Sequence, residues 1–513
     1  MASHAGRWHL LTLAALALAV TGMWATFGGP FERGWLGHNG ARYAQIARNY
    51  ERNGLLHLRA APLRNAGTAD AERPDVYAHH PPALAMTVAV AFRWLGESED
   101  SARLVPALAT LLMLLLFARL VHLVAGAAVA ALATLAAASQ AMVSVYGAHV
   151  DVQGAPVLCL SVAVLLAYRR WREGGALWPV LVLSALASAF DWFGLYAPMG
   201  CALHLWFTDR GRRRAALGLM AWTLVLFVAW VGWLVTLPGM SMGRLRGAAG
   251  VRGPDALRAS GDQLLEGVRA WLAGTGELMP GWPALLMLSL VVLLGALRPA
   301  SDARSADDDS SPLGGRGLLA LLLLPPLAHG LLFPAGMLQH GYWLFGLPLG
   351  LGLGFALAVG RLKPAIAIAA AAVLVLAGLA GRQAVLADRD ELAVRIGETL
   401  ASVTSPDDVI LTNYDTNPPG PGAAEGVDAY VLMRPEVTWY ADRVVRGLGL
   451  KPGLGSDDLA AALRRRPDAT WFLEVPWPSM PGDDLLSALA ARAGAPPRLL
   501  SESPPVRLHR LGP

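Results

Sequence analysis

The fold is decided by the stretch GAAVAALATLAAASQAMVSVYGAHVDVQGAPVLCLSVAVLLAYRRWR, residues 126–172. It contains two apolar runs, 126–145 and 154–168, with Asp151 between them and a cluster of arginines after the second run. This pattern is typical of membrane-spanning helices joined by a short turn. An ionised carboxylate at a membrane boundary is costly unless it lines a polar cavity or has a partner. Asp151 is therefore a candidate functional residue.

The same arrangement recurs at Asp191, between apolar runs 176–190 and 195–208. Of the 513 residues, 55% are hydrophobic and 16% are charged, and the mean hydropathy is +0.44. This composition excludes an ordinary soluble domain and predicts an α-helical polytopic membrane protein with about eleven transmembrane helices. The candidate spans are 8–27, 104–122, 126–145, 154–168, 176–190, 195–208, 215–237, 282–297, 318–333, 342–360 and 363–381.

The remaining composition narrows the class of protein further. The net charge is only +4, and no arginine or lysine stripe with interleaved aromatic residues occurs, so no nucleic-acid partner is expected. Cys159 and Cys201 both fall in apolar spans, which is typical of small buried side chains rather than of a disulfide or a metal pair. Abundant alanine, glycine and arginine indicate a GC-rich bacterial genome.

Loop charge predicts the orientation in the membrane. One set of short loops is basic, whereas the loops with Asp151, Asp191 and His340 hold almost no arginine or lysine. Because cytoplasmic loops are enriched in basic residues, both acids are expected at the outer face of a bacterial cytoplasmic membrane. To keep the basic loops inside, segment 83–95 is interpreted as a short re-entrant or interfacial helix. The basic loops carry Arg169, Arg170, Arg172, Arg210, Arg212, Arg213, Arg214, Arg298, Arg304, Arg316, Arg361 and Lys363.

Two domains are expected. Residues 1–381 form the transmembrane domain, with outer loops 28–103 and 238–281, and residues 382–513 form a small extracytoplasmic α/β domain. In the second domain, helical patterns at 383–403, from Ser456 to Arg466, and after Asp483-Asp484 alternate with predicted strands at 409–413, 437–445 and 470–475.

The first outer loop carries the most specific patterns. Residues 35–54, WLGHNGARYAQIARNYERNG, place Tyr43, Ile46, Ala47 and Tyr50 on one helical face, which predicts an amphipathic helix at the outer interface. The loop ends in YAHHPPALAM (77–86), where two prolines favour an extended entry to the next helix.

These segments, in this order, resemble a known family. ARYAQIARNY, the HPP turn, WLGESEDSARLVPAL (94–108), YGAHVDVQGAP (146–156), SAFDWFGLYAP (188–198) and HGYWLFGLPLG (340–350) are similar to the polytopic GT-C glycosyltransferases related to protein O-mannosyltransferases and aminoarabinose transferases. The resemblance covers most of residues 8–380. It implies transfer of a sugar from a polyprenyl-phosphate donor to a lipid, glycan or protein acceptor.

One departure affects the catalytic assignment. The family usually has an acidic residue at the start of the first-loop helix, as the presumed general base, and this chain has His38-Asn39 there. Glycosyl transfer needs a base, cationic groups for the phosphate and an apolar groove for the lipid. Asp151 is the first candidate for the base, or for an acid that positions it. Asp191 is second, and His38 is the alternative.

Other polar and aromatic residues are candidates for substrate binding. They are Asn39, Tyr43, His79, His80, Arg103, Trp192, His340 and Tyr342, with Arg244, Arg246 and Arg252 as weaker candidates. A structural reading stays open for each: Asp151 could cap the helix that starts near 153, Asp191 could form a structural ion pair, and His79 and His80 could only shape the turn. No cofactor is expected, and no spacing supports a metal site of His38, His79 and His80.

Two other classes of function stay open. A transporter or flippase of a lipid-linked substrate would also need acids in the membrane, although the chain shows no internal repeat. A non-catalytic relative would explain His38-Asn39 at the place of the usual acid.

Overall fold

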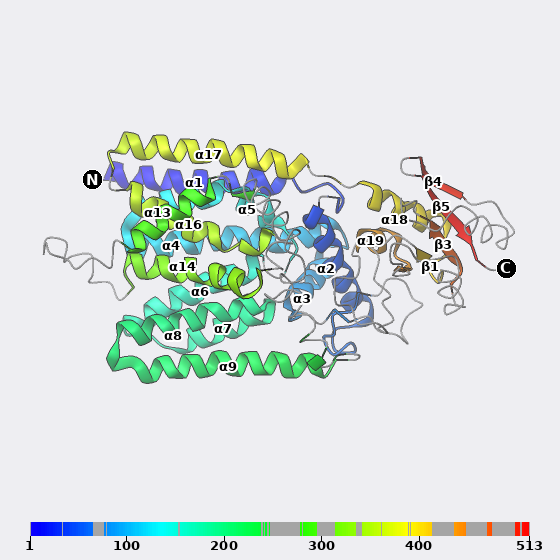
Figure 1. Cartoon of the computed structure of the whole chain (residues 1–513), viewed down its shortest axis with the longest axis horizontal. Coiled ribbons are helices and arrows are strands. Elements are labelled where there is room, and N and C mark those ends of the chain that lie inside the picture. The colour runs from blue at the N-terminus through cyan, green and yellow to red at the C-terminus, as the bar shows by residue number, and fades with distance from the viewer. Residues whose placement is uncertain are drawn as a thin grey trace, which may run out of the picture. The chain divides into compact units, whose positions relative to one another are not determined.

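The chain divides into two units. The membrane unit comprises Met1–Gly28 and Ala78–Asp388, and the α/β unit comprises Gly29–Tyr77 and Arg389–Pro513 (Figure 1). The computed structural model describes residues 2–32, 34–64, 76–77, 80–151, 154–237, 240, 242–243, 246, 278–279, 281–294, 313–334, 341–360, 362–387, 389, 391–412, 435–447, 469–474, 498–502 and 505–511. The domain bounds expected from the sequence, 1–381 and 382–513, stay a prediction.

The membrane unit is built of apolar helices. They are α1 (Ala2–Trp24), α3 (Ala83–Leu95), α4 (Glu99–Ser139), α5 (Ala141–Ser144), α6 (Ala155–Arg172), α7 (Trp178–Phe190), α8 (Tyr196–Thr208), α9 (Arg213–Val235), α13 (Trp282–Leu294), α14 (Gly315–Leu332), α16 (Leu347–Val359) and α17 (Pro364–Ala387). Among the described residues, four helices are long and apolar enough to cross a membrane, and further apolar helices are shorter. Short 3-10 turns η1 (Tyr146–Ala148), η2 (Trp192–Leu195), η3 (Arg210–Arg212) and η5 (Gly341–Leu344) lie between helices.

Helix α4 consists of two segments that run in opposite directions. Its helical geometry is interrupted at Gly126, which has φ 86° and ψ 170°. The Thr110 hydroxyl donates a hydrogen bond to the Gly147 carbonyl oxygen over 2.7 Å, so the chain on either side of Gly126 folds back on itself. The break separates the segments predicted at 104–122 and 126–145. Glycine suits this position because side chains rarely tolerate that backbone conformation.

Small residues allow the helices of the membrane unit to approach closely. A Cβ atom added at Gly352 of α16 would lie 2.6 Å from the Ala133 carbonyl oxygen of α4, and one added at Gly378 of α17 would collide with Ser139. In a membrane, helix association depends on such close packing because lipid offers no hydrophobic driving force between helices.

The α/β unit contains a five-stranded mixed sheet with strand order β2-β1-β3-β5-β4. The strands are β1 (Val409–Thr412), β2 (Val444–Gly447), β3 (Trp471–Glu474), β4 (Arg498–Glu502) and β5 (Pro505–Arg510). β1 pairs in parallel with β2 and β3, whereas β5 is antiparallel to β3 and β4. Helices α18 (Glu391–Val403) and α19 (Pro435–Ala441) contribute Ile396, Leu400 and Val437 to the core against the sheet.

Two predicted strands of this unit are confirmed at β1 and β3. The strand predicted at 437–445 is wrong: residues up to Ala441 belong to α19, and β2 starts at Val444. Pro435 is at the first position of α19, where its fixed φ favours a helix, and this local effect outweighs the β-branched and aromatic residues that follow. The helix predicted at 383–403 is divided between the end of α17 and α18. The helical patterns predicted from Ser456 to Arg466 and after Asp483 lie outside the described residues.

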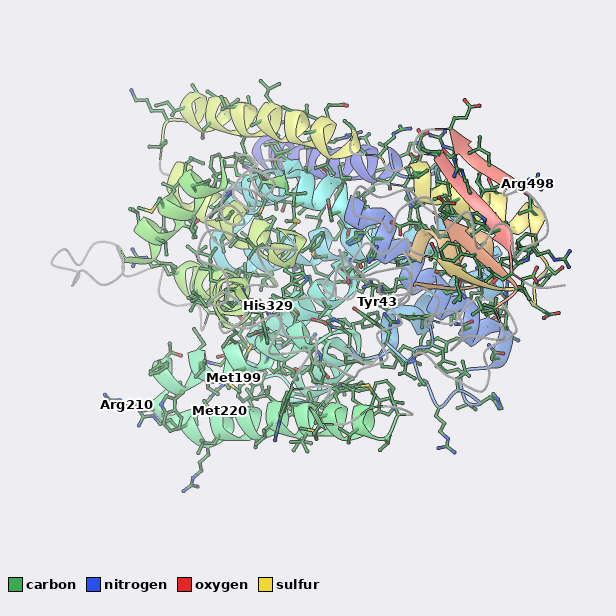
Figure 2. The ribbon with its side chains drawn as sticks, turned by 45° about the vertical axis from the view of Figure 1, so that its right-hand side comes forward. Tyr43, Met199, Arg210, Met220, His329 and Arg498 are labelled. Atoms are coloured by element: carbon green, nitrogen blue, oxygen red, sulfur yellow. The ribbon has the colours of Figure 1, made fainter. Side chains whose placement is uncertain are left out.

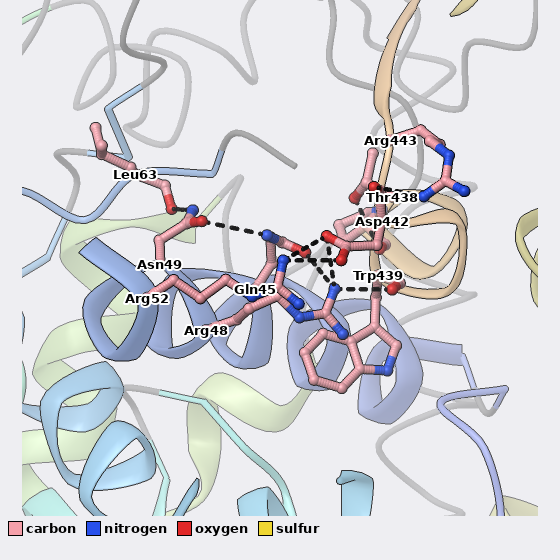
Figure 3. A network of polar contacts seen from close by, with 10 residues as sticks. Gln45, Arg48, Asn49, Arg52, Leu63, Thr438, Trp439, Asp442 and Arg443 are labelled. Carbon is pink, nitrogen blue, oxygen red and sulfur yellow. Dashed lines mark hydrogen bonds and ion pairs between the residues drawn. The ribbon is translucent and has the colours of Figure 1, made fainter. Parts of the chain in front are cut away.

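Helix α2 (Gly34–Asn53) confirms the helix predicted at 35–54, and its face with Tyr43, Ile46, Ala47 and Tyr50 is buried. Its polar face is also buried in part, because it packs against α19 within the α/β unit (Figure 3). The position of this helix at the outer interface of the membrane stays a prediction. Burial raises the pKa of Tyr50, whose neutral hydroxyl donates a hydrogen bond to the Ala60 carbonyl oxygen over 2.7 Å.

Candidate functional site

In the membrane unit, Asp191 and His80 form a buried pair. Asp191 follows α7 and accepts a hydrogen bond from the backbone N–H of Phe193 over 2.7 Å, which caps η2. Its other carboxylate oxygen lies 2.6 Å from Nδ1 of His80. Asp191 is 0% exposed and His80 is 9% exposed. Both oxygens of Asp191 thus have protein partners, so this carboxylate orients His80 rather than facing an open cavity.

Asp151 has a similar arrangement with a histidine that the sequence analysis did not select. Its carboxylate lies 3.4 Å from Nε2 of His149, and both residues are buried. The N-cap of α6 is Gly154, and no side chain caps that helix. The capping role considered for Asp151 is therefore not observed. The spacing His-x-Asp in YGAHVDV was a signal for this pair.

Arg103 and Trp192 are also in the membrane unit. Arg103 lies in the first turns of α4 and is 7% exposed, and its guanidinium is 3.4 Å from the carboxylate of Asp100. Asp100 accepts two further contacts from the backbone N–H of Gly28. Trp192 packs against Phe227 of α9, with ring centroids 5.7 Å apart. The contact with Asp100, which also accepts from the Gly28 N–H, holds Arg103 at a fixed position near the start of α4.

A small apolar groove lies between α6, α8, α14 and α16. Its lining includes Leu158, Phe193, Tyr196 and Pro325. The Tyr196 hydroxyl is 3.2 Å from Nδ1 of His329, a buried residue of α14 that also contacts the rings of Phe193 and Trp343. Figure 2 labels His329 in the membrane unit. The walls of the groove are mainly apolar, and Ser161 and Tyr196 add hydroxyl groups to them. Sequence reasoning did not predict it because its walls come from four separate helices.

The α/β unit holds the other candidates. His38, Asn39 and Tyr43 lie on α2 and are buried, with His38 8% exposed. Tyr43 packs edge-to-face on Tyr77, at a centroid distance of 6.0 Å. Nδ1 of His38 lies 3.6 Å from the carboxylate of Glu436, which the sequence analysis did not select. Glu436 is far from His38 in the sequence, and Tyr77 is far from Tyr43, so no local pattern indicated either contact.

Several candidates are not placed by the structure. His79, His340, Arg244 and Arg252 lie outside the described residues, as does the side chain of Tyr342 in η5. Arg246 is exposed. Within the described part of the chain, no group of three or more histidine, cysteine, aspartate or glutamate side chains is arranged to hold a metal ion.

Comparison with known proteins rests on fold. No protein-family model and no curated protein matches the chain. The oligosaccharyltransferase of Archaeoglobus fulgidus is similar with a TM-score of 0.57 at 12% identity, over 91% of this chain and 68% of that one. AglB of the same organism, in complex with an inhibitory peptide and a dolichol-phosphate, gives a TM-score of 0.52 at 13% identity, over 91% and 69%. The chain has the GT-C fold. ArnT from Cupriavidus metallidurans, bound to undecaprenyl phosphate, gives 0.45 at 16% identity, over 99% and 98%.

The predicted fold class is therefore confirmed as a helical membrane protein with a small C-terminal sheet.

Proposed function

We propose that this chain is a glycosyltransferase that moves a sugar from a polyprenyl-phosphate donor to an acceptor at the outer face of the bacterial cytoplasmic membrane. The observation that carries the proposal is the likeness of fold to an oligosaccharyltransferase over 91% of the chain. A related structure contains a dolichol-phosphate, which supports a lipid-phosphate donor.

The proposed reaction is an inverting displacement. An oxygen of the acceptor attacks the anomeric carbon as the bond from that carbon to the phosphate oxygen breaks, and polyprenyl phosphate leaves. The acceptor proton passes to a base, for which Asp151 and His38 are the candidates.

The membrane unit supplies groups suited to the donor. Asp191 fixes the ring of His80, and when that ring is doubly protonated its other nitrogen can donate to phosphate. Arg103 adds a guanidinium whose geometry matches phosphate oxygens. The groove lined by Leu158, Phe193 and Pro325 has the apolar walls that a lipid chain needs. We assign these parts to donor binding.

The test is transfer by the purified protein in vesicles with a panel of radiolabelled polyprenyl-phosphate sugars. Labelled sugar bound to an acceptor together with free polyprenyl phosphate supports the proposal. Unchanged donor that appears in the opposite leaflet would instead establish a flippase.

A matched pair of variants locates the chemistry. Asp191→Asn keeps an oxygen for the Phe193 N–H but removes the charge beside His80, and we expect at least tenfold slower transfer. Asp209→Asn is the control, because Asp209 follows α8 as Asp191 follows α7, and it contacts Arg172 at 3.7 Å and Arg212 at 3.6 Å. The length of α8 separates the two acids by about 20 Å. Equal effects of the two substitutions would contradict a site at Asp191.

A further inference from the structure

The ends of four helices meet at one place in the membrane unit. Helices α6 and α8 end there and α9 begins, since the Arg172 guanidinium donates to the Thr208 hydroxyl over 3.5 Å and the Arg212 guanidinium donates to the Arg172 carbonyl oxygen over 3.5 Å. Helix α14 begins at the same place, because a Cβ atom added at Gly317 would lie 2.9 Å from Nε2 of His204 in the last turns of α8.

Arginines greatly outnumber carboxylates at this place. The arginine end, as we call it, has eight arginines and two carboxylates and comprises residues 169–173, 208–214 and 315–317. Glu173 pairs with Arg169 over 2.6 Å. Asp209 lies 3.7 Å from Arg172 and 3.6 Å from Arg212. Within the described part of the chain, the other five arginines are exposed and form no ion pair: Arg170, Arg210, Arg213, Arg214 and Arg316.

Three of these exposed arginines lie on one helical face. Residues Arg210–Val235 run as one helical segment, and positions i, i+3 and i+4 of a helix are neighbours on its surface. Arg210, Arg213 and Arg214 have this spacing, and Figure 2 labels Arg210 at this end of the helices. Because like charges four residues apart destabilise a helix, an anion bound between them would stabilise this face.

Aromatic side chains indicate that the anion belongs to a lipid. The Arg213 guanidinium lies 5.0 Å from the ring centroid of Trp206, which holds it beside α8. Phe207, just before the arginine end, is 78% exposed, and Trp178, at the start of α7, is 65% exposed. Exposed aromatic rings at the ends of apolar helices are typical of the boundary between acyl chains and headgroups. The arginines are therefore at the level of lipid phosphates.

We propose that Arg210, Arg213 and Arg214 form a binding site for the headgroup of an anionic phospholipid, in the leaflet that surrounds this end of α8 and α9. Guanidinium groups match phosphate oxygens in a bidentate geometry, and the acyl chains of the lipid lie against exposed apolar side chains such as Phe207. A zwitterionic lipid offers the same phosphate but carries its own cation, so it binds less tightly. The site is independent of the proposed transferase function.

The experiment is native mass spectrometry of the purified, delipidated full-length protein. The protein is titrated with phosphatidylglycerol or with phosphatidylcholine of the same acyl chains, and the bound fraction gives an apparent Kd. An arginine near an anionic lipid contributes about fivefold in affinity. The triple variant Arg210→Gln, Arg213→Gln, Arg214→Gln should therefore weaken phosphatidylglycerol binding roughly a hundredfold and leave phosphatidylcholine binding unchanged. No preference of the wild-type protein for phosphatidylglycerol would overturn the proposal.

Two further variants separate the site from a general effect of charge. Lysine at the same three positions keeps the charges and should keep most of the affinity, so a loss equal to that of the glutamine variant would overturn the proposal. The control removes three exposed arginines of the α/β unit, with Arg395→Gln, Arg498→Gln and Arg510→Gln. It should leave the Kd unchanged, and a loss equal to that of the first triple variant would show that only net charge matters.

The last measurements test other sources of the anion. Glycerol 3-phosphate at the concentrations used for the lipid should not displace phosphatidylglycerol, and full displacement would show a site for a soluble phosphate instead. The acidic residues Asp307, Asp308 and Asp309 lie outside the described residues, so a variant with asparagine at all three is titrated as well. Its Kd should equal that of the wild type. A tenfold tighter Kd would show that the carboxylates of the chain itself occupy the arginines, which would overturn the assignment to lipid.

Discussion

Two arginines of α2 share one partner but differ in burial, and this difference predicts very different costs of removal. Arg48 and Arg52 both contact Asp442, at 3.4 Å and 2.8 Å (Figure 3). The Arg48 side chain is 7% exposed, whereas that of Arg52 is 45% exposed. We expect Arg48→Ala to loosen the contact between α2 and α19, and Arg52→Ala to have little effect.

The expected loss of free energy in Arg48→Ala follows from the contacts of Arg48. Its guanidinium lies 3.7 Å from the ring centroid of Trp439, and a desolvated cation–π contact contributes about 2 kcal/mol. It also donates to the Trp439 carbonyl oxygen over 2.9 Å and to Gln45 over 3.0 Å, and a hydrogen bond from a charged group adds about 1.5 kcal/mol. Relief of the desolvation cost of a buried charge offsets part of this sum, which leaves a loss of about 3 kcal/mol. The exposed Arg52 pair is worth about 0.5 kcal/mol.

The assay is hydrogen–deuterium exchange of the full-length protein, read in peptides from α2 and α19. A loss of about 3 kcal/mol corresponds to roughly a hundredfold faster opening in Arg48→Ala, against about twofold in Arg52→Ala. Arg48→Lys keeps the charge but not the planar group over Trp439, so it should fall between the two. Equal exchange in Arg48→Ala and Arg52→Ala would refute the reasoning from burial.

Three further outcomes are expected. Asp151→Asn should slow transfer about a hundredfold without changing membrane insertion, because it removes the charge beside His149, and full activity would rule out a role for Asp151. Asp191→Ala should lower the thermal inactivation temperature more than Asp191→Asn, since only Asn can keep the Phe193 contact worth about 1 kcal/mol; the reverse order would contradict the cap. Burial raises the pKa of the Asp408 carboxyl, the hydrogen bond from the Ser405 N–H lowers it, and the net shift of the pKa is downward. The Asp408 carboxylate therefore stabilises the fold above the pKa of the unfolded state, and this stabilisation is lost as pH falls through the pKa of the folded state. Asp408→Asn should flatten the acid limb of a pH–stability curve.

The sequence predicted the elements whose signals are local. Apolar runs of span length, the face of α2 with Ile46, and the short apolar strands at Val409 and Trp471 are patterns that a single segment carries. α19 was missed because its β-branched and aromatic residues favour a strand, whereas Pro435 at its first position favours the helix that forms.

The candidate site was predictable in its residues but not in its pairs. Asp191 and His80, or His38 and Glu436, lie too far apart in the chain for any periodicity to connect them. Asp151 and Asp191 were recognisable because a carboxylate in a membrane is costly. Glu436 lies in a polar stretch, where a glutamate is common and does not indicate a functional site. His149 was within reach of local reasoning, two residues before Asp151.

The reversal at Gly126 has a consequence for biosynthesis. The 41 residues of α4 would extend about 60 Å as one straight helix, far beyond the thickness of a hydrocarbon core. A single glycine turns that length into two antiparallel arms, and it does so without a polar loop to mark the turn for the insertion machinery. Every later helix depends on that reversal for its direction across the bilayer. A residue that straightened α4 would exchange the inner and outer ends of all the helices that follow.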